Sequence, residues 1–253
     1  MTKKATIADA VDWSSLYRTG AVAALLAGLL FRRNLGIEIS LFAAQKPPDN
    51  PADWFALLQT NRLLGLAYLH IFDVVNYLLV GLMFLALYVL LRRAGPGRMS
   101  VAAVLGLLGI GAYLASNTAF SMLTLSEQYA AAGAPQRAAL LSAGDALLAI
   151  NRFTSPGAHP GSGGYLNLLL VAAASLLISL VMLRSGVFPR AAAMVGIAAS
   201  VLDLIYCLLY ALAPGVDRQL LAVSLIPAAG PLYMVWHILV GWRLLRIARQ
   251  KGS

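Results

Sequence analysis

Charged residues are scarce in this 253-residue sequence, because they make up 11% of it, whereas soluble domains contain about 25%. Hydrophobic residues make up 60%, and the mean hydropathy is +0.78. Water could not solvate a folded chain with so much apolar surface, which excludes a soluble globular protein. The composition predicts an all-α integral membrane protein whose first partner is the lipid bilayer.

Cysteine and histidine are also rare, with one and three residues. A single cysteine excludes an intrachain disulfide. Three scattered histidines, His70, His159 and His237, do not provide the converging ligands of a metal hydrolase. A metal held by His70, Asp73 and Asp203 is the arrangement left open, although we expect neither a metal nor a cofactor. No Gly-x-Ser-x-Gly, His-Glu-x-x-His or phosphate-binding loop occurs, so no catalytic residue is predicted.

Basic residues exceed acidic ones by nine, with 19 Lys and Arg against 10 Asp and Glu. They lie mostly beside apolar runs, where they act as topology signals, so we expect no nucleic-acid partner. Twelve of the 19 fall on one side if both termini are cytoplasmic: Lys3, Lys4, Arg18, Arg92, Arg93, Arg98, Arg184, Arg190, Arg243, Arg246, Arg249 and Lys251. This bias predicts that both termini are cytoplasmic.

Six apolar segments can supply the roughly 20 residues that a helix needs to cross the hydrocarbon. Their approximate bounds are 17–42, 63–91, 101–123, 165–183, 191–213 and 220–245. We therefore predict a single membrane domain over residues 1–253, folded as a six-transmembrane-helix bundle in the cytoplasmic (inner) membrane.

Two long outer loops are predicted to carry short amphipathic helices at the membrane interface. In residues 46–62, Asp53 is expected to cap a helix that places three apolar side chains on the interface: Trp54, Phe55 and Leu58. In residues 124–163, a second helix with one apolar stripe is expected to begin at Pro135.

Polar residues inside three of the spans fall on one face of each predicted helix. Polar and ionisable groups in a membrane usually face the bundle interior or a water-filled cavity. The candidate ligand-binding residues on these faces are His70, Asp73, Tyr77, Asn117, Asp203 and Tyr206. The alternative interpretation is that such residues only fasten helices together by hydrogen bonds.

Two cations interrupt the first span at Arg32 and Arg33, about 21–23 Å along the helix from Arg18. This places them in the same outer layer of the membrane as Asp73 and Asp203. Charges in a low dielectric are best satisfied by each other, so an ion pair is expected, with Arg33 and Asp73 as the favoured partners. A structural pair and a functional site both remain open.

Several segments resemble a bacterial six-span family known as domain of unknown function 4386. They are Trp-Phe-Ala-Leu-Leu-Gln (54–59), Leu-Leu-Gly-Leu (63–66), Leu-Ala-Leu-Tyr (85–88), Ser-Glu-Gln-Tyr-Ala-Ala-Ala (126–132), Ser-Leu-Val-Met-Leu-Arg-Ser-Gly-Val-Phe (179–188) and Leu-Val-Gly-Trp-Arg-Leu-Leu (239–245). The resemblance covers nearly the whole chain and implies six spans. It implies no activity or site residue.

The leading functional hypothesis is a multi-pass membrane protein that binds or conducts a small-molecule ligand through an outward-facing polar pocket. The alternative is a non-catalytic structural or accessory subunit, which would assemble as a homo-oligomer or with a membrane-complex partner. An intramembrane enzyme is the third hypothesis, and the lack of a recognisable catalytic motif in the sequence argues against it.

The charge bias generates a topology prediction. Reporter fusions placed after Arg98 and after Lys251 should both report the cytoplasm, because the loops at 92–98 and 184–190 carry basic residues and no acidic ones. A fusion near Gly161 should report the exterior. A periplasmic signal from the fusion after Arg98 would overturn the assignment of the spans.

Overall fold

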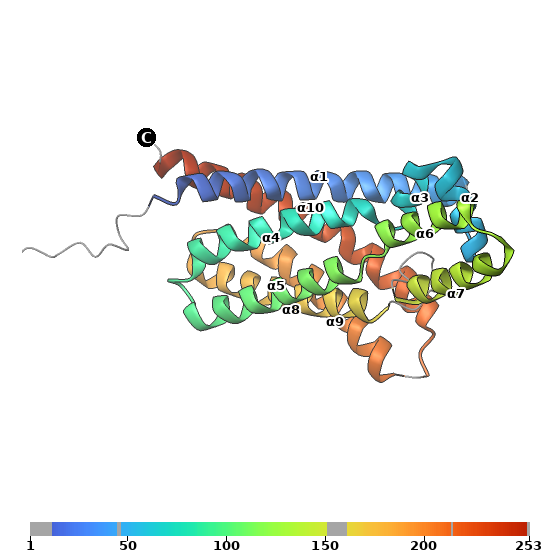
Figure 1. Ribbon diagram of the computed structural model, residues 1–253. Coiled ribbons are helices and arrows are strands. Elements are labelled where there is room, and N and C mark those ends of the chain that lie inside the picture. The colour runs from blue at the N-terminus through green and yellow to red at the C-terminus, as the bar shows by residue number, and fades with distance from the viewer. Residues whose placement is uncertain (1–11, 45–46, 151–160, 214, 252–253) are drawn as a thin grey trace, which may run out of the picture.

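The computed structural model describes residues 12–44, 47–150, 161–213 and 215–251, and within them all side chains except those of residues 31–44, 218–219, 222–223 and 251. This part of the chain is all helical (Figure 1). Its helices are α1 (Ser14–Ala44), α2 (Pro51–Thr60), α3 (Arg62–Tyr68), α4 (Ile71–Leu91), α5 (Pro96–Ser116), α6 (Ala119–Ala131), α7 (Ala134–Ile150), α8 (Ser162–Ser185), α9 (Arg190–Leu212) and α10 (Arg218–Lys251).

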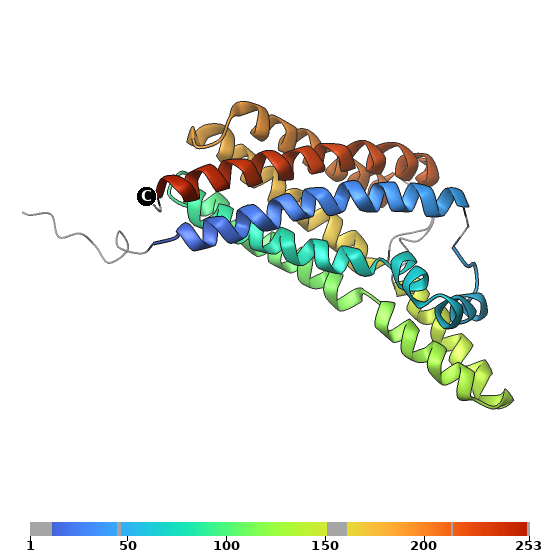
Figure 2. The ribbon, with the colours of Figure 1, turned by 90° about the horizontal axis from the view of Figure 1, so that it is seen from above.

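Six long helices form a closed ring. Each contacts its two neighbours in the order α1, α4, α5, α8, α9 and α10, and α10 packs against α1 to close the ring. Figures 1 and 2 show α1 and α10 side by side along the length of the bundle. The start of α1, the end of α10 and the short α4–α5 and α8–α9 connections all lie at one end of this ring (Figure 1).

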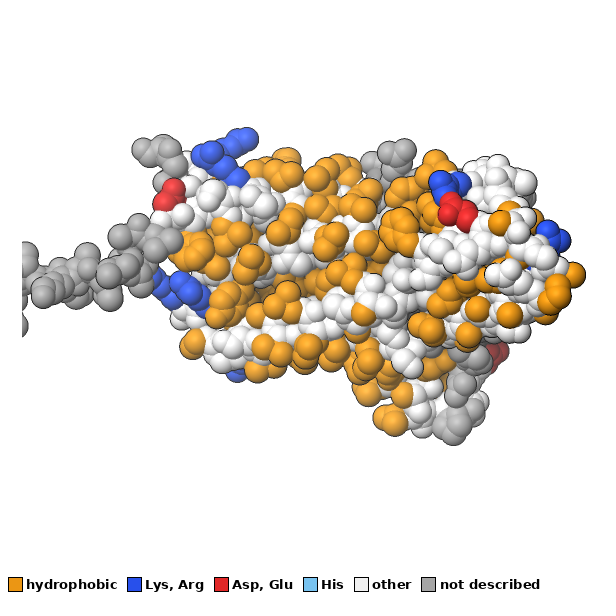
Figure 3. Space-filling model, in the orientation of Figure 1, with side chains coloured by type: hydrophobic (Ala, Val, Ile, Leu, Met, Phe, Trp, Pro, Cys, Tyr) orange, Lys and Arg blue, Asp and Glu red, His pale blue; other side chains and the backbone are white. Residues whose placement is uncertain are grey.

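Five segments are long and apolar enough to cross a membrane: 71–91, 96–131, 162–185, 190–212 and 224–250. The first helix adds a shorter apolar stretch, Ser14–Leu30. Hydrophobic side chains cover the face of the long helices in Figure 3, and the basic side chains visible there lie toward its two ends. The chain is therefore a multi-pass membrane protein that contacts the lipid bilayer.

Two of the predicted spans are divided between two helices. Residues 63–91 are interrupted at His70, which adopts a left-handed backbone conformation with φ 58° and ψ 37°. Residues 101–123 are interrupted at Asn117, where the backbone becomes extended with ψ 123°. The predicted segments 165–183 and 191–213 coincide with α8 and α9 within three residues at each end.

The two interruptions lie against each other. The Asn117 Nδ2 donates to the carbonyl of Leu69 over 3.3 Å, and the Tyr113 hydroxyl donates to the carbonyl of His70 over 3.3 Å. The Asn117 Oδ1 also accepts from the amide of Ala119 at 3.1 Å. Backbone groups freed by each helix break are therefore satisfied by side chains, as burial requires.

Helices α2, α3, α6 and α7 form a helical cap at the end of the ring opposite the termini (Figures 1 and 2). The cap has a hydrophobic core of its own, which contains Trp54, Phe55, Leu58, Tyr68, Leu69, Ala119, Met122 and Leu148. Trp54, Phe55 and Leu58 are thus buried among cap helices, and the expectation that they lie on the membrane interface is wrong. One helix alone could not bury this stripe, whereas four packed helices can.

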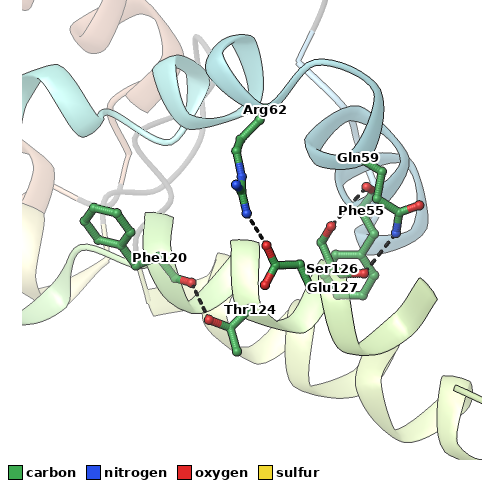
Figure 4. Close-up of polar contacts among 7 residues, drawn as sticks. All are labelled: Phe55, Gln59, Arg62, Phe120, Thr124, Ser126 and Glu127. Carbon is green, nitrogen blue, oxygen red and sulfur yellow. Dashed lines mark hydrogen bonds and ion pairs between the residues drawn. The ribbon is translucent and has the colours of Figure 1, made fainter. Parts of the chain in front are cut away.

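Polar contacts tie α2 and α3 to α6 (Figure 4). Arg62 forms an ion pair with Glu127. The Gln59 Nε2 donates to the carbonyl of Ser126 at 2.9 Å, and the Ser126 Oγ donates to the carbonyl of Phe55 at 3.3 Å. The last two bonds occupy backbone groups inside the cap, so they fix the register of α2 along α6.

The cap helices begin close to the predicted positions, but the residue that caps α2 differs from the predicted one. Asn50, not Asp53, caps α2, since its Oδ1 accepts from the amide of Asp53 at 3.0 Å and Pro51 follows at the first helical position. Helix α7 begins at Ala134, one residue before the expected Pro135.

The ring generates a stability prediction at Gly20 on α1. A Cβ there would overlap the Cβ of Ala86 on α4, and an alanine side chain cannot rotate away. Gly20→Ala should therefore destabilise the protein by about 1–3 kcal/mol, as overpacking does, and lower the thermal midpoint in detergent by several degrees. Gly111→Ala is the matched control, because nothing lies within 4 Å of its Cβ position. An equal effect of both substitutions would contradict the close α1–α4 packing.

Candidate functional site

The capped end of the ring holds the first group of candidate residues. The His70 Nδ1 lies 3.3 Å from the Asp73 Oδ2 one turn into α4, with side-chain exposures of 12% and 31%. One turn further on, the ring of Tyr77 packs against that of Tyr113 on α5, with 4.5 Å between centroids. Asp73 and Tyr77 are electrostatic neighbours. This group is partly open to the exterior of the bundle.

Asp203 lies deeper, near the middle of α9, and is 5% exposed. Tyr233 on α10 is its hydrogen-bonding neighbour. The Tyr233 hydroxyl lies 3.4 Å from the Ser200 Oγ, and Ser200 donates to the carbonyl of Gly196 at 2.7 Å. The Ser175 hydroxyl of α8 lies close to that of Tyr233. Helices α8, α9 and α10 thus share one polar layer inside the ring.

Tyr77 connects the outer group with this deeper layer. Its side chain neighbours Asn167 on α8 and interacts electrostatically with both Asp73 and Asp203. Asn167 is itself buried. Four of the six candidate residues, His70, Asp73, Tyr77 and Asp203, therefore belong to one polar interior, which runs from the capped end toward the middle of the ring.

The other two candidates, Asn117 and Tyr206, have different surroundings. The Asn117 side chain holds the two helix breaks together, as described above. Tyr206 packs beside Tyr210, whose ring also approaches that of Tyr165, and belongs to a separate cluster with Cys207 and Leu221. Tyr206 remains an electrostatic neighbour of Asp203, so the two groups adjoin.

A further polar group lies beyond Tyr233, toward the termini end. His237 is buried, and its Nδ1 lies 2.6 Å from the carbonyl of Tyr233. A Cβ at Gly196 would collide with the Ser179 Oγ and with the Trp236 Nε1, so only glycine lets these two polar atoms approach α9. His237 is not among the candidate residues predicted from the sequence, and the structure places it next to the polar layer.

The termini end of the ring is apolar inside. Its fully buried side chains include Leu87, Leu91, Met99, Met182, Leu244 and Ala248. These residues come from α4, α5, α8 and α10 and pack into one hydrophobic cluster. The polar interior therefore adjoins the capped end and is separated from the termini end by packed hydrocarbon.

Several buried polar atoms in this interior have no hydrogen-bond partner. They are the Asn76 Oδ1, the Asn167 Oδ1, the Ser179 Oγ and the Trp236 Nε1. Burying such an atom unpaired costs roughly 1–3 kcal/mol, and native interiors rarely leave them so.

The side chain of Arg33 lies outside the described residues, so the expected ion pair between Arg33 and Asp73 stays a prediction. Among the described residues, no group of three or more His, Cys, Asp or Glu side chains could hold a metal ion. The interior instead offers carboxylate, amide, hydroxyl and phenol groups, which recognise ligands by hydrogen bonds and charge.

Sequence reasoning missed the contributions of α8 and α10. Asn167, Ser175 and Ser179 recur on α8 at intervals of eight and four residues, and Tyr233 and His237 on α10 are four apart. Such spacing places each set on one helix face. Serine and tyrosine are common in membrane helices, so the signal was weak in each helix and becomes clear only where the helices meet.

The separate cluster around Cys207 generates a labelling prediction. Cys207 is 0% exposed, and the Tyr165 hydroxyl donates to its carbonyl at 3.1 Å. A small charged thiol reagent should therefore leave Cys207 unmodified in the folded protein and react after denaturation. Ser142→Cys in a Cys207→Ser background is the positive control, because residue 142 is exposed on α7. Rapid labelling of native Cys207 would contradict this packing.

Comparison with known proteins gives one match. The sequence model of the family described as domain of unknown function (DUF4386) matches residues 14–242. Searches of curated proteins and of solved structures gave no match. The match spans every long helix of the ring up to Trp242 in α10. The chain therefore belongs to the DUF4386 family, a domain of unknown function.

Proposed function

We propose that this protein binds a small polar ligand inside the helix ring, reached from the capped end. The observation that supports this proposal is the set of buried polar atoms without hydrogen-bond partners on α4 and α8, namely the Asn76 Oδ1, the Asn167 Oδ1 and the Ser179 Oγ. They accompany Asp203, a buried carboxylate that would be costly to keep in a membrane for packing alone.

The opposing interpretation is that polar side chains only hold helices together. Two contacts fit that role, since Asn117 and Tyr113 both satisfy backbone carbonyls at the α3–α4 break. The interior atoms differ because they form no such bond. Polar groups that serve as helix glue gain stability only when they are paired, whereas a binding site leaves groups unpaired until its ligand arrives. The interior therefore favours binding over glue.

The direction of access follows from the asymmetry of the interior. Asp73 is 31% exposed at the capped end. Beyond His237, the termini end is filled with packed side chains such as Leu91 and Leu244. A site of this shape admits a ligand from the capped end and holds it, which supports binding rather than open conduction.

The same proposal includes a full topology. Residues 1–253 form one membrane domain, with α1 as the sixth span, because α1 completes the ring by packing against both α4 and α10. Both termini lie in the cytoplasm of a bacterial cell and the capped end faces outward. The basic residues of the α4–α5 and α8–α9 connections, at the same end as the termini, support this orientation in the inner membrane.

Substitutions at two serines test the proposal. Ser179→Ala removes a buried hydroxyl without a hydrogen-bond partner and should keep or raise the thermal midpoint in detergent, because sites held for ligands are often strained. Ser200→Ala is the matched control, because the Ser200 hydroxyl forms hydrogen bonds with Gly196 and Tyr233. This substitution should lower the free energy of unfolding by about 0.5–1.5 kcal/mol and therefore lower the thermal midpoint. An equal loss in both variants would indicate helix glue and favour an accessory subunit.

A further inference from the structure

A half-buried arginine at the termini end of the ring is held in place through one of its nitrogen atoms. The Arg243 Nε on α10 donates to the carbonyl of Val187, in the α8–α9 connection, over 2.6 Å. Gly186, in the left-handed conformation with φ 65°, turns the chain just before this carbonyl. The two Nη groups of Arg243 form no hydrogen bond or ion pair with a described residue. The remaining N–H donors of a fixed guanidinium are therefore available to a partner.

Two further side chains lie beside Arg243 on the outer face of α10. Gly241 faces Leu25 of α1, and Arg243, about 200° further around the helix, faces the α8–α9 connection. Trp242 and Arg246 fall between these two directions, at about 100° and 140° from Gly241, and therefore point away from both neighbours. Trp242 is 60% exposed, and the Arg246 Cζ lies 5.7 Å from the centroid of its ring. An exposed tryptophan near the end of a membrane helix is typical of the membrane–water interface.

The surrounding chain adds positive charge without negative charge. Arg184 and Arg190 flank the α8–α9 connection, each three residues from Val187, and both are exposed. The connection itself and helices α8 and α10 contain no Asp or Glu. Asp12, at the same end of the ring, accepts hydrogen bonds from the amide and the hydroxyl of Ser14 at the start of α1. This surface is therefore complementary in charge to an anion.

We propose that the surface formed by Arg243, Arg246, Trp242 and the α8–α9 connection binds an anionic phospholipid. Guanidinium groups bind phosphate oxygens through paired hydrogen bonds. Basic pockets between membrane helices bind anionic lipid head groups at the same level of the bilayer. The Trp242 indole adds an apolar ring beside the guanidinium groups, which suits the glycerol and acyl part of a lipid and offers nothing to a free phosphate. This inference is independent of the ligand proposed for the interior.

Thermal unfolding of the purified full-length protein in a nonionic detergent tests the inference. Added phosphatidylglycerol should raise the midpoint saturably, by about 5–10 °C at a concentration roughly 100 times its Kd. Phosphatidylcholine, whose head group has no net charge, should raise the midpoint much less at the same concentration. Equal responses to the two lipids, or an equal response to inorganic phosphate, would overturn the inference.

A pair of exposed arginines separates a defined site from a diffuse attraction of the basic end for anionic lipids. Arg246→Gln should weaken the apparent Kd for phosphatidylglycerol about tenfold, because it removes a charge-assisted hydrogen bond. Arg98→Gln is the matched control, since it removes the same charge from an exposed side chain at the same end, in the first turn of α5, which is not a ring neighbour of α10. It should leave the Kd unchanged. Equal weakening in both variants would indicate diffuse attraction and overturn the defined site.

Arg243 is tested by lipid binding rather than by stability alone. Arg243→Gln removes the Nη groups and also the hydrogen bond to Val187, so its midpoint without lipid should fall. Native mass spectrometry, at a temperature where the variant is folded, measures its Kd for phosphatidylglycerol directly. This Kd should be at least about tenfold weaker than that of the unsubstituted protein. An unchanged Kd would overturn the inference.

Discussion

The dominant constraint on this structure is that hydrocarbon offers no hydrogen bonds, so each backbone amide and carbonyl at membrane depth needs a partner within the protein. Continuous helices meet this requirement automatically, which explains α8 and α9. The breaks at His70 and Asn117 violate it locally. They are stable because Asn117 and Tyr113 bond to the carbonyls that the first break exposes. Irregular backbone is tolerated in membranes only where protein or water surrounds it.

Membrane class and the positions of α8 and α9 followed directly from hydropathy, because long apolar runs have few alternative structures. The helix breaks did not, since neither His70 nor Asn117 is a glycine or proline. A left-handed backbone at a histidine depends on tertiary contacts that no local pattern contains. The cap was also only half predictable. Its helices were expected, but their mutual burial depends on which apolar faces meet, as with Phe55 and Gly144.

For the candidate site, the sequence identified the charged residues, whose burial in a membrane is energetically costly, and missed the uncharged polar residues. Asp73 and Asp203 stand out in any apolar run because a charge there is expensive. Ser179 and Asn167 carry no charge, and each has a buried oxygen atom without a hydrogen-bond partner, which only three-dimensional packing shows. Tyr206 shows the converse limit. Helical spacing placed it on the same arc as Asp203, yet a neighbouring aromatic cluster accounts for much of its surface.

The level shared by the two helix breaks has a mechanical consequence. Helices α3 and α6 carry the cap, and each joins the ring through a break, at His70 and Asn117. A continuous helix transmits bending along its whole length, whereas a break confines rotation to a few backbone dihedrals. A tilt of the cap would therefore be confined to rotation at these two breaks, which lie one turn of helix above Asp73. Such a rotation would move the cap relative to Asp73 without bending the long helices of the ring.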